Sequence, residues 1–214
     1  MATLNDTTIS LPTLQSVEQS FAECLISTFD LSNCFYTTHI SQESRKYFNL
    51  YAQDKIFCHN VMPQGWNASP FYANQALEMT FSTSALQEFL QTRSEQEWET
   101  FPYTHYGQYV LSFVDDLVVH TKESYGKAVH FLAIKSMFFT LKKHGWLISL
   151  RKSTISTKEF TFLGLNWDMI NECSGLQNDR LLSILNHRIP RSTAELCSRL
   201  STIQYYGSFI PALK

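Results

Sequence analysis

Residues 109–120 read Tyr109-Val110-Leu111-Ser112-Phe113-Val114-Asp115-Asp116-Leu117-Val118-Val119-His120, and they form the most informative segment of the chain. Two runs rich in Val, Leu and aromatic residues, 109–113 and 117–120, flank a pair of acidic residues. This pattern predicts two strands joined by a tight turn, with carboxylates at its tip. Because Asp is a common turn residue, the hairpin alone leaves open whether Asp115 and Asp116 are structural or functional.

A third carboxylate lies in an early apolar segment. Leu25-Ile26-Ser27-Thr28-Phe29-Asp30-Leu31 is typical of a strand. Burying a lone Asp within it would cost on the order of several kcal/mol, so Asp30 needs a partner, a metal ion or an open cleft. Neighbouring side chains of a strand point to opposite faces. The turn must therefore bring Asp115 or Asp116 beside Asp30 if they share a site.

Three carboxylates at one place favour a magnesium site, because Mg²⁺ prefers oxygen ligands and leaves positions open for substrate phosphates. Two such ions about 3.5–4 Å apart can activate an attacking oxygen and stabilise a leaving one at phosphorus. This is polymerase or nuclease chemistry. Zinc is disfavoured, because the seven histidines show no spacing such as His-Glu-x-x-His.

The remaining pattern predicts an α+β fold, a small antiparallel sheet with helices on one face, followed by a helical basic segment. We expect extended segments near 35–40, 47–57, 146–150 and 160–165, a surface excursion at 92–106, and helices over 69–90, 125–143, 178–189 and 193–203. The boundary between domains is expected near 167–178, which divides the chain into 1–170 and 171–214.

Composition and charge limit the classes of function. At 44% hydrophobic and 17% charged, the chain is globular, and its longest uncharged segment, 56–77, is too polar to span a membrane. Residues 1–121 carry 4 Lys and Arg against 13 Asp and Glu, a balance of −9, whereas residues 122–214 carry 13 against 6, a balance of +7. A basic half suits a polyanion, although two ordinary solvated surfaces explain it equally well.

Five segments, in order, resemble the reverse transcriptases of retroviruses and LTR retrotransposons. They are Phe29-Asp30-Leu31-Ser32-Asn33-Cys34-Phe35, the Pro-Gln-Gly loop and helix start at 62–70, Phe113-Val114-Asp115-Asp116, Phe162-Leu163-Gly164, and Tyr205-Tyr206-Gly207-Ser208-Phe209-Ile210-Pro211. Phe113 replaces the more usual Tyr. The resemblance runs from about Leu11 to Pro211. It implies a polymerase palm with residual fingers in 1–170 and partial thumb or connection helices in 171–214.

The resemblance also implies an activity and a catalytic centre. The chain would be an RNA-directed DNA polymerase core that transfers a nucleotide from a dNTP to a primer 3′-hydroxyl on an RNA or DNA template. Asp30 and Asp115 would ligate two Mg²⁺ ions, or Mn²⁺ ions, with Asp116 beside them in a supporting role. Lys152 would protonate the leaving pyrophosphate, although exposed lysines in basic runs are common.

Other residues would bind the substrates. Phe35 would lie under the nucleotide sugar and exclude a 2′-hydroxyl. Gln64 would contact the nucleotide, and Gly65 would let the backbone come close to it. Leu163 and Gly164 would clamp the primer end. The plain alternatives are a core Phe on a strand for the first, and a packed strand with a bulge for the last two.

The aromatic pair Tyr205-Tyr206 could stack on a nucleic-acid base. Its helical spacing from Leu196 and Leu200 favours packing instead.

The sequence departs from the family at both ends. Only 29 residues precede Asp30, and Met1–Glu23 contain no Lys or Arg, where complete enzymes carry basic fingers that grip the triphosphate. The chain stops at Lys214, where the family continues toward an RNase H domain. We therefore expect a fragment or relic of a retroelement gene, whose fingers or RNase H region lies in the same polyprotein or a partner chain.

Two further readings of the function remain open. One is a catalytically impaired retroelement-derived fragment that acts as a nucleic-acid-binding or scaffolding domain, and the other is a carboxylate-dependent nuclease. The N-terminus lacks a secretory signal, and the five cysteines include no Cys-x-x-Cys pair and are expected to be free thiols. We expect the chain in the cytoplasm or a virus-like particle, without a membrane partner.

Overall fold

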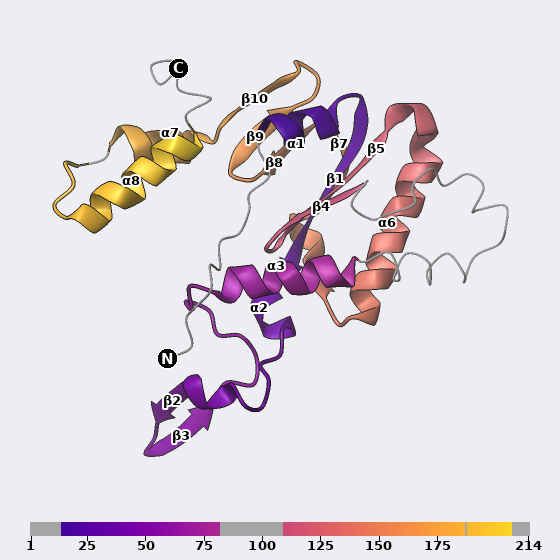
Figure 1. Ribbon diagram of the computed structural model, residues 1–214. Helices are drawn as coiled ribbons and strands as arrows, with labels where there is room; N and C mark the ends of the chain where they lie inside the picture. Colours follow the sequence, from indigo (N-terminus) through magenta and orange to yellow (C-terminus); the bar gives the residue numbers. More distant parts are fainter. Residues whose placement is uncertain (1–13, 82–108, 187, 207–214) are drawn as a thin grey trace. The chain divides into compact units, whose positions relative to one another are not determined.

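The computed structural model describes residues 14–81, 109–186 and 188–206 and divides the chain into two compact units, Met1–Thr157 and Lys158–Lys214 (Figure 1). In the first unit the elements are α1 (Leu14–Phe21), β1 (Cys24–Ser32), α2 (Cys34–Thr37), η1 (Arg45–Tyr47), β2 (Asn49–Ala52), β3 (Lys55–Cys58), α3 (Ser69–Thr80), β4 (Val110–Phe113), β5 (Asp116–Lys122), η3 (Glu123–Tyr125), α6 (Gly126–Lys143), β6 (Leu147–Ile148), η4 (Leu150–Lys152) and β7 (Thr154–Thr157). In the second they are β8 (Glu159–Phe162), β9 (Leu165–Asp168), β10 (Cys173–Leu176), α7 (Asn178–Leu185) and α8 (Thr193–Tyr205). The palm–thumb boundary placed at residue 170 stays a prediction.

The main sheet of the first unit is antiparallel, with the strand order β4-β5-β1-β6, and β7 also pairs with β1. Its central pair, β1 and β5, runs from Cys24 opposite Lys122 to Asp30 opposite Asp116. β4 and β5 form the hairpin that the sequence predicted. A separate two-stranded hairpin, β2–β3, occupies the predicted extended segment 47–57.

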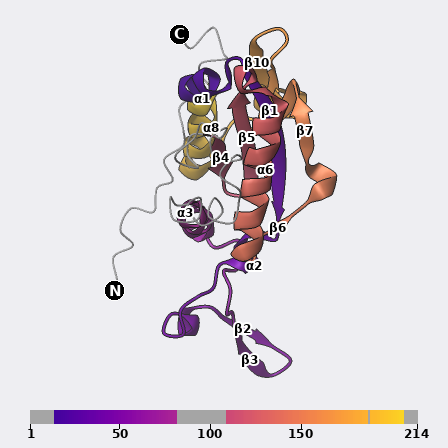
Figure 2. The same ribbon diagram turned by 90° about the vertical axis from the view of Figure 1, so that its right-hand side faces the viewer.

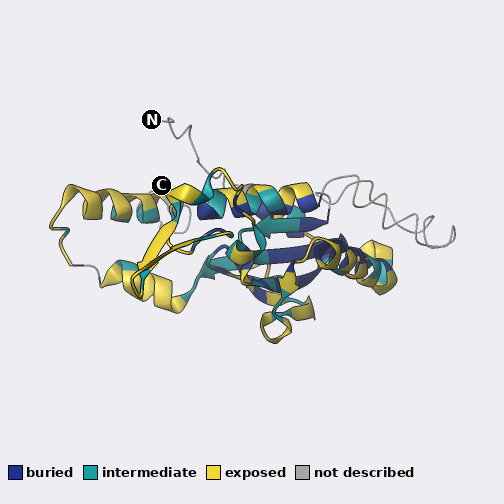
Figure 3. Cartoon of the chain, turned by 90° about the horizontal axis from the view of Figure 1, so that it is seen from below, coloured by how far each residue is buried: buried dark blue, intermediate teal, exposed yellow. Residues whose placement is uncertain are grey.

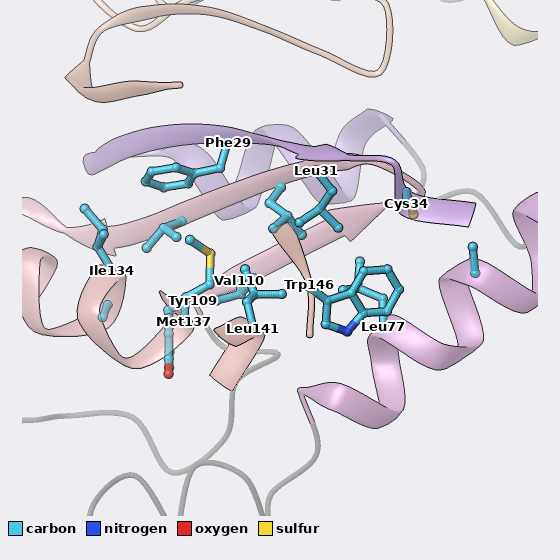
Figure 4. Close-up of a cluster of buried hydrophobic side chains, with 14 of the residues drawn as sticks. Phe29, Leu31, Cys34, Leu77, Tyr109, Val110, Ile134, Met137, Leu141 and Trp146 are labelled. Atoms are coloured by element: carbon cyan, nitrogen blue, oxygen red, sulfur yellow. The ribbon is translucent and has the colours of Figure 1, made fainter. Parts of the chain in front are cut away.

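The core lies on the face of the sheet that α3 and α6 cover (Figures 2 and 4). Phe29 of β1 and Leu117 of β5 point to this face and are almost completely buried. On the opposite face, at the far end of β1, α1 packs with the ring of Phe21 edge-on to His120. The predicted α+β class is confirmed, with the addition that α1 covers part of the second face.

Helix α6 illustrates how the sequence pattern produces an element. Val129, Ala133, Met137 and Leu141 recur every four residues, and all four are buried on one side of the helix. Lys142 and Lys143 occupy the last turn, where cations are favourable, and Gly145 follows with φ +78°. The expected helix 125–143 therefore matches the observed one to within one residue.

Two expected strands of the first unit are corrected. Residues 34–37 form the short helix α2 rather than an extended segment, because Asn33 adopts the left-handed conformation (φ 57°) and turns the chain after β1. In 146–150 only Leu147–Ile148 pair as a strand, and a 3₁₀ turn follows. α3 is observed to Thr80, whereas the expected extension to residue 90 and the surface excursion at 92–106 lie outside the described residues.

The second unit contains a three-stranded antiparallel sheet, β10-β9-β8, and two helices. The expected extended segment 160–165 is interrupted by a two-residue turn, Leu163-Gly164, with φ values of 56° and 75°. α8 begins as its capping box predicts, since Ser192 Oγ accepts a hydrogen bond from the Glu195 N–H at 3.2 Å. Figure 3 shows that many positions of α7 and α8 are exposed.

Two further properties concern the chemistry of the chain. All five cysteines are free thiols. No described helix is long and apolar enough to cross a membrane.

Candidate active site

Asp30 and Asp116 lie directly opposite each other on β1 and β5. Cα atoms in such antiparallel pairs are about 4.5–5.5 Å apart. Their sequence neighbours Phe29 and Leu117 point into the core, so both carboxylates project from the opposite face of the sheet. The side chain of Asp30 is 17% exposed. Strand alternation and register thus bring together two acidic groups that are 86 positions apart in the sequence.

Asp115 occupies the exposed second position of the β4–β5 turn. Phe113 pairs with Asp116, so the connection contains only Val114 and Asp115. Val114 has φ +56°, a left-handed conformation that is unfavourable for a β-branched side chain. The tight turn places the third predicted carboxylate next to the other two.

Three elements hold the backbone of this turn. The Leu31 N–H of β1 donates to the carbonyl of Asp115 at 2.7 Å. The Val114 N–H donates to Asn74 Oδ1 of α3, and the Val114 carbonyl accepts from the Cys34 thiol of α2, each at 3.4 Å. Sequence reasoning missed Asn74, because no motif spacing connects a residue in the middle of a helix with a hairpin 40 positions later.

Lys152 reaches the same site from η4. The Ser149 N–H donates to the carbonyl of Asp30 at 2.8 Å, which fixes the loop beside β1. Lys152 Nζ then donates to Asp30 Oδ2 at 3.0 Å, in an ion pair in which the lysine side chain is 68% exposed. This hydrogen bond, together with the charge of Asp30, raises the pKa of Lys152, so the amine is charged at neutral pH.

Several carboxylates lie close together at this site, and burial and their negative charges raise the pKa values of neighbouring groups. Burial, followed by the charges of Asp115 and Asp30, raises the pKa of Asp116 to about 6, while Lys152 opposes the shift. Burial, followed by the charge of Asp115, raises the pKa of the Cys34 thiol to about 12. A cation near these carboxylates would relieve their mutual repulsion.

The donor set fits a hard divalent ion that keeps open positions. Within 14–81, 109–186 and 188–206, no group of three or more His, Cys, Asp or Glu side chains is arranged so that it could hold a metal ion. Mg²⁺ commonly uses only one or two carboxylates and fills its other positions with water and substrate phosphates. Asp30, Asp115 and Asp116 therefore offer suitable oxygens but an incomplete coordination shell.

Phe35 lies on α2, five residues after Asp30. Its ring is half-buried and packs against the core cluster. The structure thus supports the interpretation of Phe35 as a core residue, with the correction that it lies on a helix and not on a strand. Its role at the nucleotide stays a prediction.

Gln64 and Gly65 are exposed in the loop before α3. Ser69 Oγ donates to the Pro63 carbonyl at 2.8 Å and thereby closes the loop. Gly65 has φ +90°, and a Cβ built on it would meet nothing within 4 Å. The glycine is therefore required by backbone conformation, and the space beside it is open, as a close approach to a ligand requires.

Leu163 and Gly164 belong to the second unit and form the turn of the β8–β9 hairpin. The bulge in the alternative of a packed strand is therefore wrong, although Leu163 is buried as that alternative expected. Their role at a primer end stays a prediction.

The family model "Reverse transcriptase (RNA-dependent DNA polymerase)" matches residues 3–167. The Pro-Pol polyprotein of Simian foamy virus type 1 is 27% identical over 185 residues, which is 86% of this chain and 14% of that protein. The enzymatic polyprotein of Carnation etched ring virus is 27% identical over 195 residues, 88% of this chain and 25% of that protein. The chain thus spans a small part of these relatives.

Solved structures give the same fold. A foamy viral protease-reverse transcriptase in complex with an RNA/DNA hybrid aligns with a TM-score of 0.57 and 22% identity, covering 92% of this chain and 24% of that one. A second foamy viral structure, in complex with double-stranded DNA, aligns with a TM-score of 0.60 and 21% identity, covering 93% of this chain and 31% of that one.

Proposed function

The chain belongs to the reverse transcriptase family, and from this we propose that it is the catalytic core of an RNA-directed DNA polymerase. It would extend a primer 3′-hydroxyl with deoxynucleotides on an RNA or DNA template. One observation supports this most strongly. Asp30 and Asp116 are register partners on neighbouring strands, with Asp115 in the adjoining turn. Three carboxylates on one patch of a sheet suit two-metal transfer at phosphorus.

Asp30, Asp115 and Asp116 would hold Mg²⁺, or Mn²⁺ in its place. When bound, these ions supply Lewis acidity toward phosphate oxygens and neutralise the charge that develops in the transition state. Asp30 and Asp115 are held by different kinds of backbone structure. Asp30 is fixed on a strand in the middle of the sheet, whereas Asp115 depends on the strained turn at Val114.

Lys152 would act on the leaving group. In the structure its amine is bound to Asp30, and its raised pKa keeps it protonated. Released from Asp30, the amine would be free to move on its flexible stem. The Nζ–H bond would then break toward the oxygen of the leaving pyrophosphate, and the neutral amine would recover its proton from water.

The nucleotide and primer contacts follow from the resemblance. Phe35 would lie under the sugar and exclude a 2′-hydroxyl, while Gln64 and the open backbone at Gly65 would contact the incoming nucleotide. Leu163 and Gly164 would hold the primer end. The support for these roles is the exposure of Gln64 and Gly65 and the turn geometry at 163–164.

We infer a template–primer duplex and a dNTP as partners. Two of the similar foamy viral structures contain an RNA/DNA hybrid or double-stranded DNA, and the relatives are parts of larger polyproteins. Fingers and RNase H regions would come from the same polyprotein or a partner chain. The site of action would be the cytoplasm or a virus-like particle.

Primer extension on a homopolymer RNA template with Mg²⁺ tests this function. We expect deoxynucleotide addition by the wild-type chain and none by Asp115→Asn, with equal binding of the duplex by both. Asp179→Asn, an acidic residue of α7 outside the site, is the matched control. Tight, salt-sensitive binding without extension would favour the nucleic-acid-binding alternative instead. Shortening of the primer in the same gel would indicate a nuclease.

A further inference from the structure

Tyr206, the residue after α8, packs on the β8–β9 turn within the second unit. Tyr206 is 8% exposed, so its ring is a packing residue, as the helical spacing favoured for it. A Cβ built on Gly164 would lie 2.8 Å from Tyr206 Oη and 3.9 Å from Cζ. The hydroxyl therefore occupies the space that a side chain at Gly164 would need.

The turn beneath Tyr206 is constrained from several directions. Leu163 and Gly164 both have positive φ, 56° and 75°, which is the requirement of a type I′ hairpin turn. Leu163 is only 7% exposed, although hairpin tips usually face solvent. Trp167 Nε1 donates to the Phe162 carbonyl at 3.0 Å and closes the base of the turn.

The end of α8 fixes Tyr206 in turn. Its N–H donates to the Thr202 carbonyl at 3.2 Å, which continues the hydrogen bonding of the helix by one residue. The backbone from which the Tyr206 side chain projects is therefore fixed by the helix. A tyrosine held in this way couples the position of the hairpin tip to the C-terminal end of α8.

We propose that Tyr206 is a positioning residue, which holds the Leu163–Gly164 turn in the conformation that aligns the primer 3′ end. The proposal rests on the proposed function, because it takes the turn as the primer contact. Beyond that function, it assigns a role to Tyr206, which would not itself contact the primer, and it gives a steric reason for glycine at position 164. A bulkier residue there meets Tyr206 Oη as well as an unfavourable φ.

The test compares four variants of the full chain: Gly164→Ala, Tyr206→Phe, Tyr206→Leu, and Gly164→Ala combined with Tyr206→Phe. Gly175→Ala is the matched control, since a Cβ at this glycine of β10 meets nothing within 4 Å. Two quantities are measured on the same duplex. One is the single-turnover rate of nucleotide addition, and the other is the photo-cross-link from a 4-thiothymidine at the primer 3′ end to the β8–β9 hairpin.

We expect Gly164→Ala and Tyr206→Leu to lower both quantities, the rate by roughly 10- to 100-fold, because misplacement by about 1 Å can cost about that much. Duplex affinity should change little. The double variant should recover part of the loss of Gly164→Ala, since Phe lacks the hydroxyl that meets the new Cβ. The control Gly175→Ala should behave as the wild type.

Failure of the proposal is distinguishable from failure of the proposed function. A wild-type chain that cross-links through the hairpin but never extends the primer would defeat the polymerase function and leave the positioning role intact. The positioning role is overturned if the wild-type cross-link maps elsewhere. It is overturned equally if Tyr206→Leu folds and keeps both readouts, or if Tyr206→Phe does not relieve Gly164→Ala.

Discussion

At the scale of single residues, Asp30 is the position from which the account can be tested most simply. Its carboxylate lies opposite Asp116 and binds Lys152 Nζ at 3.0 Å. The sequence predicted that an acidic group in an apolar strand would need a partner. It also named Lys152, but the direct pairing of these two residues depends on the loop contact between Ser149 and Asp30, which has no sequence signal.

We predict that Lys152→Gln lowers the rate of nucleotide addition by about 10²-fold, because a positioned proton donor contributes about that much. Duplex binding should be unchanged, since this amine would act on the leaving pyrophosphate and not on the duplex. Arg151→Gln, the exposed neighbour on the same turn, is the control. Single-turnover extension measures the effect, and equal losses in both variants would contradict a specific role for Lys152.

We also predict that Phe35→Val weakens discrimination against ribonucleotides by about tenfold or more, because removal of the ring makes room for a 2′-hydroxyl. Competition between dGTP and GTP in the extension assay measures the ratio. Tyr36→Val, on the exposed neighbouring residue of α2, should leave the ratio unchanged. An unaltered ratio in Phe35→Val would assign this ring to the core alone.

At the scale of elements, sequence patterns were most reliable where one signal extended over a whole segment. β1 and β5 follow their predicted ranges closely because each is a run rich in apolar and β-branched residues, and α6 does so because its four-residue apolar spacing is sustained. The pattern failed at 34–37, where one left-handed residue, Asn33, turns the chain into α2. It also could not indicate that Asn74 would hold the Val114 turn, since that contact is purely tertiary.

A buried polar network joins three of these elements. His130 of α6 lies between Ser27 Oγ of β1, 2.7 Å from Nε2, and Thr121 Oγ1 of β5, 2.9 Å from Nδ1. Burial lowers the pKa of His130 to about 4 from 6.5. The folded state therefore holds the neutral ring where the unfolded chain would already be protonated.

The sign of the pH dependence follows from this shift. The stabilisation by neutral His130 is complete above its unfolded pKa and is lost as the pH falls through about 6.5 toward 4. We predict that stability decreases by up to about 3 kcal/mol from this group over that range. His130→Gln should flatten the slope. Urea unfolding at several pH values measures it, and an equally steep slope in His130→Gln would contradict the assignment.

At the scale of the whole molecule, negative charges are concentrated in residues 1–121 and positive charges in residues 122–214. The acidic half contains the three carboxylates, and the basic half contains 13 Lys and Arg against 6 Asp and Glu. Composition alone could not decide between a polyanion partner and ordinary solvated surfaces. Family membership makes nucleic acid the partner to test.

We predict that affinity for a primer–template duplex falls steeply with salt and with little dependence on sequence. Replacing Arg188 and Arg191, two exposed basic residues between α7 and α8, by Gln should reduce the slope of log affinity against log salt by about 1 to 2, as expected when both contact phosphates. Fluorescence anisotropy at several salt concentrations measures this slope. A wild-type affinity that does not change with salt would contradict a phosphate-binding surface.

The proposed function depends above all on carboxylates, far apart in the sequence, that converge on one site. Single-turnover nucleotide addition in Asp30→Asn, Asp115→Asn and the double variant tests this convergence most directly. If both groups serve one site, each single change should lower the rate by about 10³-fold or more, and the double change should cost little beyond either one. Losses that multiply as for independent sites, or a single variant that retains the wild-type rate, would contradict the shared site.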